Sequence, residues 1–265
     1  MKAMIFAAGL GTRLKPITDT MPKALVPVCG QPLLYHVITK LVAAGYDDLV
    51  VNVHHFPDQI IHYLQSHDFG ARIAVSDERD FLRETGGGIK YARPLLLNEG
   101  IPGCPSTSSG TTGNDGSEPF LVHNVDIVSN LDLDWLREQH REGALATLVV
   151  SDRKTQRYFL FDEDNRLKGW TNIATGEVRS PFGDIDPDGC RKLAFAGIHL
   201  ISPAIFDAFD KYGFGDRFSI VDFYLRACAD YPIYAVVPLD FQLVDVGKFD
   251  ALPEAEATCA KILND

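Results

Sequence analysis

Two glycines and three basic side chains stand close together near the start of the chain. Gly9 and Gly11 follow a short apolar run, and Arg13, Lys15 and Lys23 come directly after them. A glycine turn can aim several backbone N–H groups at one point, and nearby Arg and Lys side chains add the positive charge that phosphates need. This segment therefore predicts a phosphate-binding loop.

Two aspartates further along the chain are candidates for the same site. Asp126 and Asp245 each come just after a predicted strand, and the carboxyl ends of parallel strands open onto one crevice. Mg²⁺ binds a few protein oxygens and completes its shell with water and phosphate oxygens. Two carboxylates beside a phosphate loop therefore predict a Mg²⁺-bridged nucleotide. The alternatives are that Asp126 caps the following segment and that Asp245 belongs to an ordinary turn.

Several other classes of protein are disfavoured by composition and motif. The glycine loop lacks the GxxxxGK[ST] pattern of a P-loop, and Leu14 stands where GxGxxG needs its last glycine. The net charge of −11 argues against a general nucleic-acid binder. Five cysteines without CxxC spacing exclude a standard zinc cluster.

The elements that would position these residues alternate between strand and helix. Strands are predicted over 3–8, 49–53 and 71–76, with helices over 31–44 and 57–65 between them. This order predicts an α/β fold, a Rossmann-like, mostly parallel mixed sheet flanked by helices. The predicted ligand site lies at the carboxyl ends of its strands.

The second half of the chain has a different pattern. A hairpin is predicted over 157–170, a strand over 192–201, and helices over 203–209, 219–229 and 249–263. We expect a single domain over 1–265, with a nucleotide-binding half (1–150) and a substrate-binding lobe in the second half (151–265). The polar segment 98–118 is expected to be a flexible surface insertion.

The setting expected from the sequence is cytoplasmic. The start carries no signal-peptide cleavage region, and no apolar run is long enough to span a membrane. The scattered, odd number of cysteines gives no sign of a disulfide framework. No membrane partner and no nucleic-acid partner are expected.

The glycine segment also resembles a known signature. GlyLeuGlyThrArgLeuLysPro at 9–16, with ThrAspThrMetProLysAlaLeuValProVal at 18–28, is similar to the signature of the sugar-1-phosphate nucleotidyltransferases. The similarity continues at 84–88, 124–126, 195–198 and 244–247, and so spans nearly the whole chain except the insertion. GluThrGlyGlyGly at 84–88 looks closest to the N-acetylmuramate-1-phosphate uridylyltransferases, with mannose-1-phosphate guanylyltransferases a near second.

The resemblance implies a role for each matching residue. It implies catalytic roles for Arg13 and Lys23, nucleotide binding by Ala7, Ala8, Gly9, Gly11, Thr12, Glu84 and Gly86, sugar-phosphate binding by Asn124 and Gly197, and Mg²⁺ binding by Asp126 and Asp245. For Glu84 the alternative is that it only orders its loop.

The implied reaction joins a nucleoside triphosphate, UTP or GTP being favoured, to a sugar-1-phosphate. The sugar-phosphate oxygen would attack the α-phosphorus in line, with no covalent enzyme intermediate. The products would be a nucleotide sugar and pyrophosphate, and the enzyme would be a monomer or small homo-oligomer. Lobe 151–265 would bind the sugar.

Two other functions remain open at this stage. One is a cytidylyltransferase acting on phosphocholine or a similar phosphate, and the other is a catalytically silent sensor of nucleotide sugars. A silent relative should lose the charged residues that the chemistry needs, whereas Arg13, Lys23, Asp126 and Asp245 are all present. The chain departs from the family in having Val125 within its Asn-Val-Asp triplet and in lacking a Glu-Lys-Pro segment near Trp170.

Overall fold

The computed structural model describes residues 1–99, 118–247 and 252–264. Almost all of the insertion predicted at 98–118 lies outside this described part of the chain. The α-helices are α1 (Leu33–Ala43), α2 (Pro57–Ser66), α3 (Glu84–Tyr91), α4 (Arg93–Leu96), α5 (Leu133–Glu138), α6 (Ile205–Lys211), α7 (Ile220–Ala227) and α8 (Leu252–Asn264). Short 3-10 turns are η1 (Thr12–Leu14), η2 (Ile17–Asp19), η3 (Lys23–Leu25) and η4 (Pro187–Gly189).

The strands follow one another in the order that an α/β fold requires. They are β1 (Lys2–Phe6), β2 (Pro27–Val28), β3 (Gln31–Pro32), β4 (Asp48–Val53), β5 (Arg72–Asp77), β6 (Phe120–Asn124), β7 (Ile127–Ser129), β8 (Ala146–Ser151), β9 (Arg157–Phe161), β10 (Leu167–Asn172), β11 (Glu177–Arg179), β12 (Arg191–Ile201), β13 (Ile233–Val236) and β14 (Leu243–Asp245).

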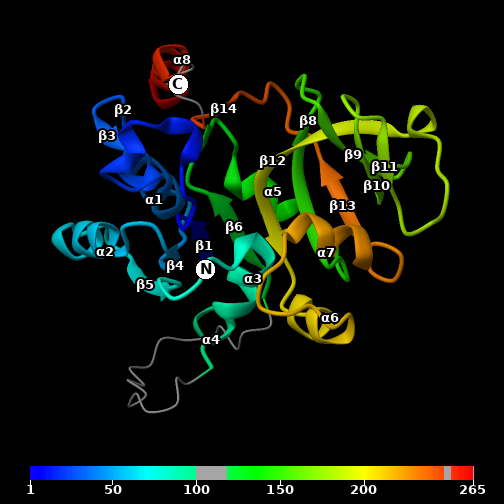
Figure 1. The fold of residues 1–265 in the computed structure, drawn as a ribbon, viewed down its shortest axis with the longest axis horizontal. Helices are drawn as coiled ribbons and strands as arrows, with labels where there is room; N and C mark the ends of the chain where they lie inside the picture. Colours follow the sequence, from blue (N-terminus) through cyan, green and yellow to red (C-terminus); the bar gives the residue numbers. More distant parts are fainter. Residues whose placement is uncertain (100–117, 248–251, 265) are drawn as a thin grey trace.

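A mixed sheet runs through the molecule (Figure 1). Its strand order is β11-β10-β9-β12-β6-β1-β4-β5, and β8 and β13 branch from β12. Strands β6, β1, β4 and β5 are parallel, whereas β12 joins β6, β8 and β9 in antiparallel fashion. The predicted α/β fold with a mostly parallel mixed sheet is therefore confirmed.

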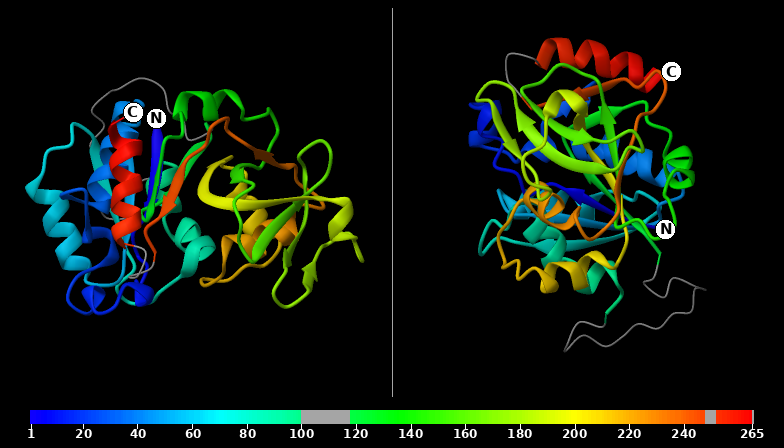
Figure 2. Two further views of the ribbon diagram at one scale, coloured as in Figure 1. Left: turned by 90° about the horizontal axis from the view of Figure 1, so that it is seen from above. Right: turned by 90° about the vertical axis from the view of Figure 1, so that its right-hand side faces the viewer.

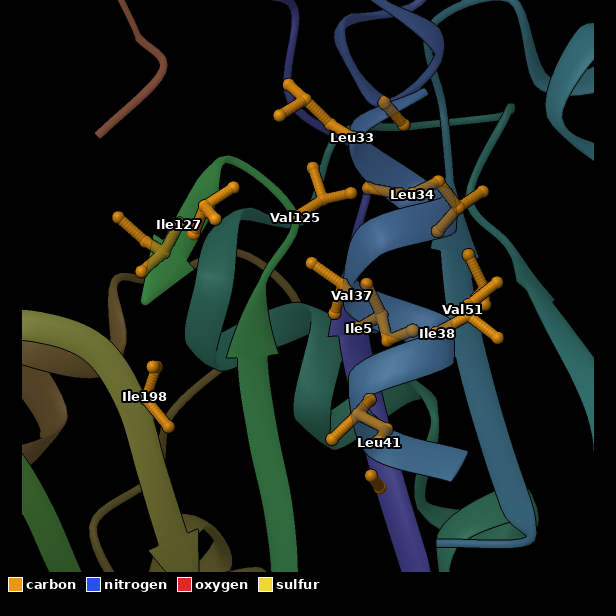
Figure 3. Packing of buried hydrophobic residues seen from close by; sticks show 14 of the residues in the cluster. Ile5, Leu33, Leu34, Val37, Ile38, Leu41, Val51, Val125, Ile127 and Ile198 are labelled. Carbon is orange, nitrogen blue, oxygen red and sulfur yellow. The ribbon is translucent and has the colours of Figure 1, made fainter. Parts of the chain in front are cut away.

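Helices cover both faces of the sheet because its central strands are apolar on both sides. On β1, Ala3 and Ile5 belong to one buried cluster, which includes side chains of α1, α2, α5 and α8. Met4, between them, belongs to the other cluster, with side chains of α3, α4, α6 and α7. In Figure 3, Val37 and Ile38 of α1 lie against Ile5 and neighbouring strand residues. Because successive side chains of a strand point to opposite faces of the sheet, β1 contributes to both hydrophobic cores.

The second half extends the sheet away from α1 and α2, as Figure 2 shows from above. The predicted hairpin is present as β9 and β10, which pair in antiparallel register. A third strand, β11, pairs with β10 between the predicted hairpin and the strand predicted over 192–201. This edge strand is short and fully exposed, so it has no apolar pattern to predict it.

Hydrogen bonds at the first residues of α7 and α3 show how these two helices begin. Ser219 caps the helix predicted over 219–229, because its Oγ accepts a hydrogen bond from Val221 N at 3.2 Å. Helix α3 begins at Glu84 and contains the three glycines at 86–88. Their place in a helix reflects tight packing, since Gly86 N and Gly87 N both donate to Phe218 O.

The remaining boundaries agree closely with the expected elements. The described part of the last helix is Leu252–Asn264, and its predicted start at 249 falls on residues 248–251, which lie outside the described part. Across the described residues, none of the helices combines the length and the apolar character needed to cross a bilayer.

Removing a buried side chain of α1 is predicted to weaken the fold. Ile38 is fully buried, so Ile38→Ala should lower the free energy of unfolding by roughly 2–5 kcal/mol through lost burial and a new cavity. Urea denaturation followed by circular dichroism measures the change. Gln65→Ala, on the exposed side of α2, is the control and should stay within about 0.5 kcal/mol.

Candidate nucleotide-binding site

A cavity of about 400 Å³ opens at the carboxyl ends of β6, β1 and β4. It lies where sequence reasoning expected the ligand site, because three neighbouring parallel strands end there. The lining residues are Phe6, Ala7, Ala8, Gly9, Lys23, Asn52, Leu82, Glu84, Thr85, Asn124, Val125, Asp126 and Ser219.

The glycine loop leaves β1 along one wall of this cavity. Gly11 has a φ of 63°, and a Cβ there would lie 2.8 Å from Thr18 Cγ2. The carbonyl oxygen of Gly11 accepts hydrogen bonds from Thr18 Oγ1 and Leu14 N, each at 2.8 Å. The turn therefore needs glycine for both its backbone conformation and its space. Gly11 and Thr12 lie beside the cavity and are not among its lining residues.

Lys23 and Asp126 form an ion pair at the cavity wall. Their side chains are only 10% and 19% exposed, so both charges are largely removed from water. Partial burial makes the pairing important, because an uncompensated charge there would be costly. The cavity wall therefore carries one positive and one negative group side by side. The ammonium can bind a phosphate, and the carboxylate can bind a cation.

Asp245 reaches the same edge from the far end of the chain. Strand β14 pairs with β7 in antiparallel register, and Val246 N donates to Asp126 O at 2.9 Å. A Cβ on Gly247 would lie 2.5 Å from Asp245 Oδ1 and 2.9 Å from Arg13 Nη2. Asp245 and Arg13 therefore both border Gly247, next to Asp126 but outside the cavity lining.

Asn124 and Gly197 meet across the β6–β12 pair. Gly197 has a φ of 73°, and a Cβ there would lie 2.5 Å from Asn124 Nδ2. The glycine thus leaves room for the Asn124 amide, which lines the cavity. Val125 is 4% exposed, its N–H donates to Phe6 O at 3.1 Å, and it lies near Leu34 in Figure 3. Its side chain belongs to the apolar cluster beneath the site.

Glu84 lines the cavity from the start of α3. Its Oε1 accepts a hydrogen bond from Arg217 Nε at 3.0 Å, and its φ of 61° is unusual for a residue other than glycine. Gly86 is buried beyond it and does not line the cavity. The Gly86 N–H donates to Phe218 O at 2.9 Å, so this group already has a partner.

Two polar residues that sequence reasoning did not select lie behind the loop. Asn52 Oδ1 accepts hydrogen bonds from Ala7 N at 2.8 Å and Ala8 N at 3.3 Å. Asn52 Nδ2 donates to Glu78 Oε1 at 2.8 Å. The available signal was a single polar residue inside the apolar strand LVVNV, at the strand's carboxyl end.

Two histidines near the site are neutral at physiological pH. Burial lowers the pKa of His123 to about 4 and that of His199 to about 3. His123 Nδ1 bonds to Asn124 O, and His199 Nδ1 bonds to the Tyr224 hydroxyl at 2.7 Å. Among the residues that the structure describes, no group of three or more His, Cys, Asp or Glu side chains is arranged to hold a metal.

The structure brings most of the predicted site residues to one edge of the sheet. Those that line the cavity are Ala7, Ala8, Gly9, Lys23, Glu84, Asn124 and Asp126. The others are outside its lining: Gly11, Thr12, Arg13, Gly86, Gly197 and Asp245. Their individual roles stay predictions.

Comparison with known proteins gives a consistent family. The model of the family described as "Nucleotidyl transferase" matches residues 2–160. An N-acetylmuramate alpha-1-phosphate uridylyltransferase of Caulobacter vibrioides is 32% identical over 272 residues, covering 98% of this chain and 97% of that protein. A mannose-1-phosphate guanyltransferase of Eremothecium gossypii is 28% identical, covering 78% of this chain and 51% of that protein.

Solved structures share the fold. A putative glucose-1-phosphate thymidylyltransferase of Bacillus anthracis has a TM-score of 0.74 at 18% identity, covering 98% of this chain and 95% of that chain. At this identity the likeness concerns architecture alone, and it agrees with the mixed α/β sheet described above.

The two loop glycines are predicted to differ sharply in their tolerance of a side chain. Gly11→Ala places a Cβ against Thr18 at positive φ and should lower the free energy of unfolding by roughly 1–2 kcal/mol or more. Gly9→Ala is the matched control, because nothing lies within 4 Å of its Cβ position and its φ is not positive. Thermal denaturation compares them. Equal stability of the two variants would contradict this reading of the turn.

Proposed function

Because the chain belongs to the nucleotidyl transferase family of sugar-1-phosphate nucleotidyltransferases, we propose that it joins a nucleoside triphosphate to a sugar-1-phosphate and releases pyrophosphate. The observation that carries the proposal is the Lys23–Asp126 pair at one side of the cavity, beside the backbone of residues 7–9. The pair can meet both a phosphate and a cation where the glycine loop ends. The cavity volume of about 400 Å³ lies within the usual range of small-molecule binding sites.

The order of the strands supports a direction for the nucleotide. Asp126 follows β6 and is paired with Lys23, whereas Asn52 belongs to β4 on the other side of β1. Phosphates belong beside the Lys23 ammonium, whereas the Glu84 carboxylate is already paired with Arg217 and offers no positive charge to them. The base therefore belongs at the Asn52 and Glu84 end, with the ribose over residues 7–9.

The residues at the β6 side fit a magnesium ion. Asp126 and Asp245 lie on neighbouring segments joined by the Val246 N to Asp126 O hydrogen bond, and both offer hard oxygen donors. Two carboxylates suffice for Mg²⁺ because substrate phosphates and water complete its shell, which agrees with the lack of a larger acidic cluster in the described residues. A bound Mg²⁺ would neutralise phosphate charge and orient the triphosphate.

The side chains would contribute by positioning and by charge. With the substrates bound, the Lys23 ammonium would exchange part of its pairing with Asp126 for contact with the reacting phosphates. Arg13 would stabilise the negative charge that develops on pyrophosphate as it leaves. Asn124, whose side-chain amide has room because residue 197 is a glycine, would hydrogen-bond the sugar or the ribose. In-line attack by the sugar-phosphate oxygen on the α-phosphorus then needs no covalent intermediate.

The finer substrate choice is proposed from the relatives. A uridylyltransferase with an N-acetylmuramate 1-phosphate substrate matches the chain over nearly its whole length, and a guanyltransferase matches less of it. We therefore favour UTP, then GTP, as the nucleotide. Segment 151–265, which adds β9 to β11 to the sheet, is the proposed lobe for the sugar.

Turnover is predicted only when both substrates are supplied. The purified protein with MgCl₂ and each of UTP, GTP, CTP and ATP, paired with sugar-1-phosphates or phosphocholine, should release pyrophosphate with a sugar-1-phosphate. A coupled phosphate assay after pyrophosphatase treatment measures the release. Release with CTP and phosphocholine alone would favour the cytidylyltransferase alternative. Nucleotide-sugar binding without turnover would favour a sensor.

Asp126 is predicted to be essential for metal-dependent turnover. Asp126→Ala should lower kcat by roughly 100-fold or more, because it removes a metal ligand and leaves Lys23 without its partner. Circular dichroism should show an intact fold. Glu142→Ala, on the exposed turn between α5 and β8, should keep normal kcat. Undiminished turnover in the Asp126 variant would remove this residue from the mechanism.

A further inference from the structure

We propose that Asn52 and Glu78 act as a positioning relay that holds the backbone of Ala7 and Ala8 in the nucleotide-binding arrangement. The inference rests on the proposed function, because the relay is meant to act on the nucleotide. Neither residue belongs to the signature segments at the start of the chain. Both are brought behind the loop by the parallel pairing of β1, β4 and β5.

The hydrogen bonds of the relay leave the Asn52 amide one orientation. Its Oδ1 faces two backbone donors, Ala7 N at 2.8 Å and Ala8 N at 3.3 Å. Its Nδ2 must then face an acceptor, and Glu78 Oε1 accepts from it at 2.8 Å. A carboxylate only accepts hydrogen bonds, so it selects the amide orientation that presents oxygen to the loop.

The relay is buried, which makes its hydrogen bonds consequential. Asn52 is 1% exposed and Glu78 is fully buried. Glu78 Oε2 is buried without a hydrogen-bond partner among the described residues, and burial raises the pKa of this carboxyl. Burying a carboxyl group in this way is costly, so its position calls for a role that an apolar side chain would not fill.

The surrounding backbone is shaped around this pair. Glu78 N donates to Val53 O at 2.8 Å, and His54 Nδ1 bonds to Glu78 O at 2.7 Å, so the β4 and β5 ends fix the Glu78 backbone. A Cβ on Gly88 would lie 3.1 Å from Glu78 Oε1 and 3.2 Å from Asn52 Nδ2. The third glycine of the 84–88 segment thus leaves room for the relay.

The relay connects to the ligand through a short path. Asn52 lines the cavity, and the two N–H groups that it holds belong to cavity-lining residues. With these N–H groups held from behind, the remaining polar groups of the loop face the nucleotide in a fixed position. Pre-ordering of this kind lowers the cost of binding and leaves the chemical step unchanged.

Reversing the polarity of the relay tests it. Asn52→Asp removes the Nδ2 donor and sets two carboxyl groups against each other, so the Kd for the nucleotide should rise about tenfold. In the double variant N52D/E78Q, the new amide can donate to the new carboxylate, whose other oxygen can still accept from Ala7 N. This variant should bind within about threefold of the wild type.

Calorimetric titration with UTP and with GTP, using whichever binds the wild-type protein more tightly as the probe, measures the Kd. Steady-state kinetics should show the same rise in KM for the triphosphate, with KM for the sugar-1-phosphate changed less than about twofold. Glu163→Gln, exposed on the β9–β10 turn, should bind as the wild type does. If N52D fails to fold, Glu78→Leu against Glu78→Gln tests the same link, the leucine variant binding more weakly.

The outcomes separate the relay from a general structural role. Weak binding by N52D/E78Q equal to that of N52D, at unchanged melting temperature, would overturn the relay. Equal rises in both KM values would do the same. Nucleotide binding by the wild-type protein without pyrophosphate release from any substrate pair would contradict the proposed function, while the binding titrations would still decide the relay.

Discussion

The site depends on the parallel pairing of β1 with β6 on one side and β4 on the other. This register brings the ends of three strands to one edge, so that residues 7–9, Asn52 and Asn124 to Asp126 surround a single cavity. Because the strands are buried on both faces, the register is fixed by two apolar cores. A slip by one residue would turn Ile5 toward the wrong core and displace the loop that follows.

Charge at that edge is balanced before any ligand arrives. Lys23 and Asp126 neutralise each other in a place largely removed from water, and Arg13 and Asp245 gather at Gly247 close by. Such a balance keeps a partly buried site from unfolding locally, since an unpaired charge would draw in water. In the function proposed above, a triphosphate and a cation would exchange partners with groups already in place, without a costly rearrangement.

The sequence allowed much of this arrangement to be predicted, for reasons that differ between residues. Strand and helix order followed from apolar periodicity, and Asp126 and Asp245 could be proposed together because both come after strands. Asp245 reaches the edge through a pairing of β14 with β7, and β7 is a short strand that periodicity did not reveal. Glycine spacing indicated a tight turn, but it did not reveal what each glycine contacts.

The segment at 84–88 shows why other contacts around the site could not be predicted from the sequence. Each of its three glycines meets a different part of the protein. Gly86 faces Phe218, Gly87 faces the carbonyl of Asp216, and Gly88 faces the Asn52–Glu78 pair. Hydrogen bonds also join Glu84 to Arg217 and Thr85 to Ile220, residues that are 133 and 135 positions apart in the sequence. No repeating pattern in the sequence predicts contacts at such separations, so they are seen only in the folded structure. Helix α3 therefore supports the part of the cavity wall that Glu84 and Thr85 line, and its glycines allow close packing against Phe218, Asp216 and the Asn52–Glu78 pair.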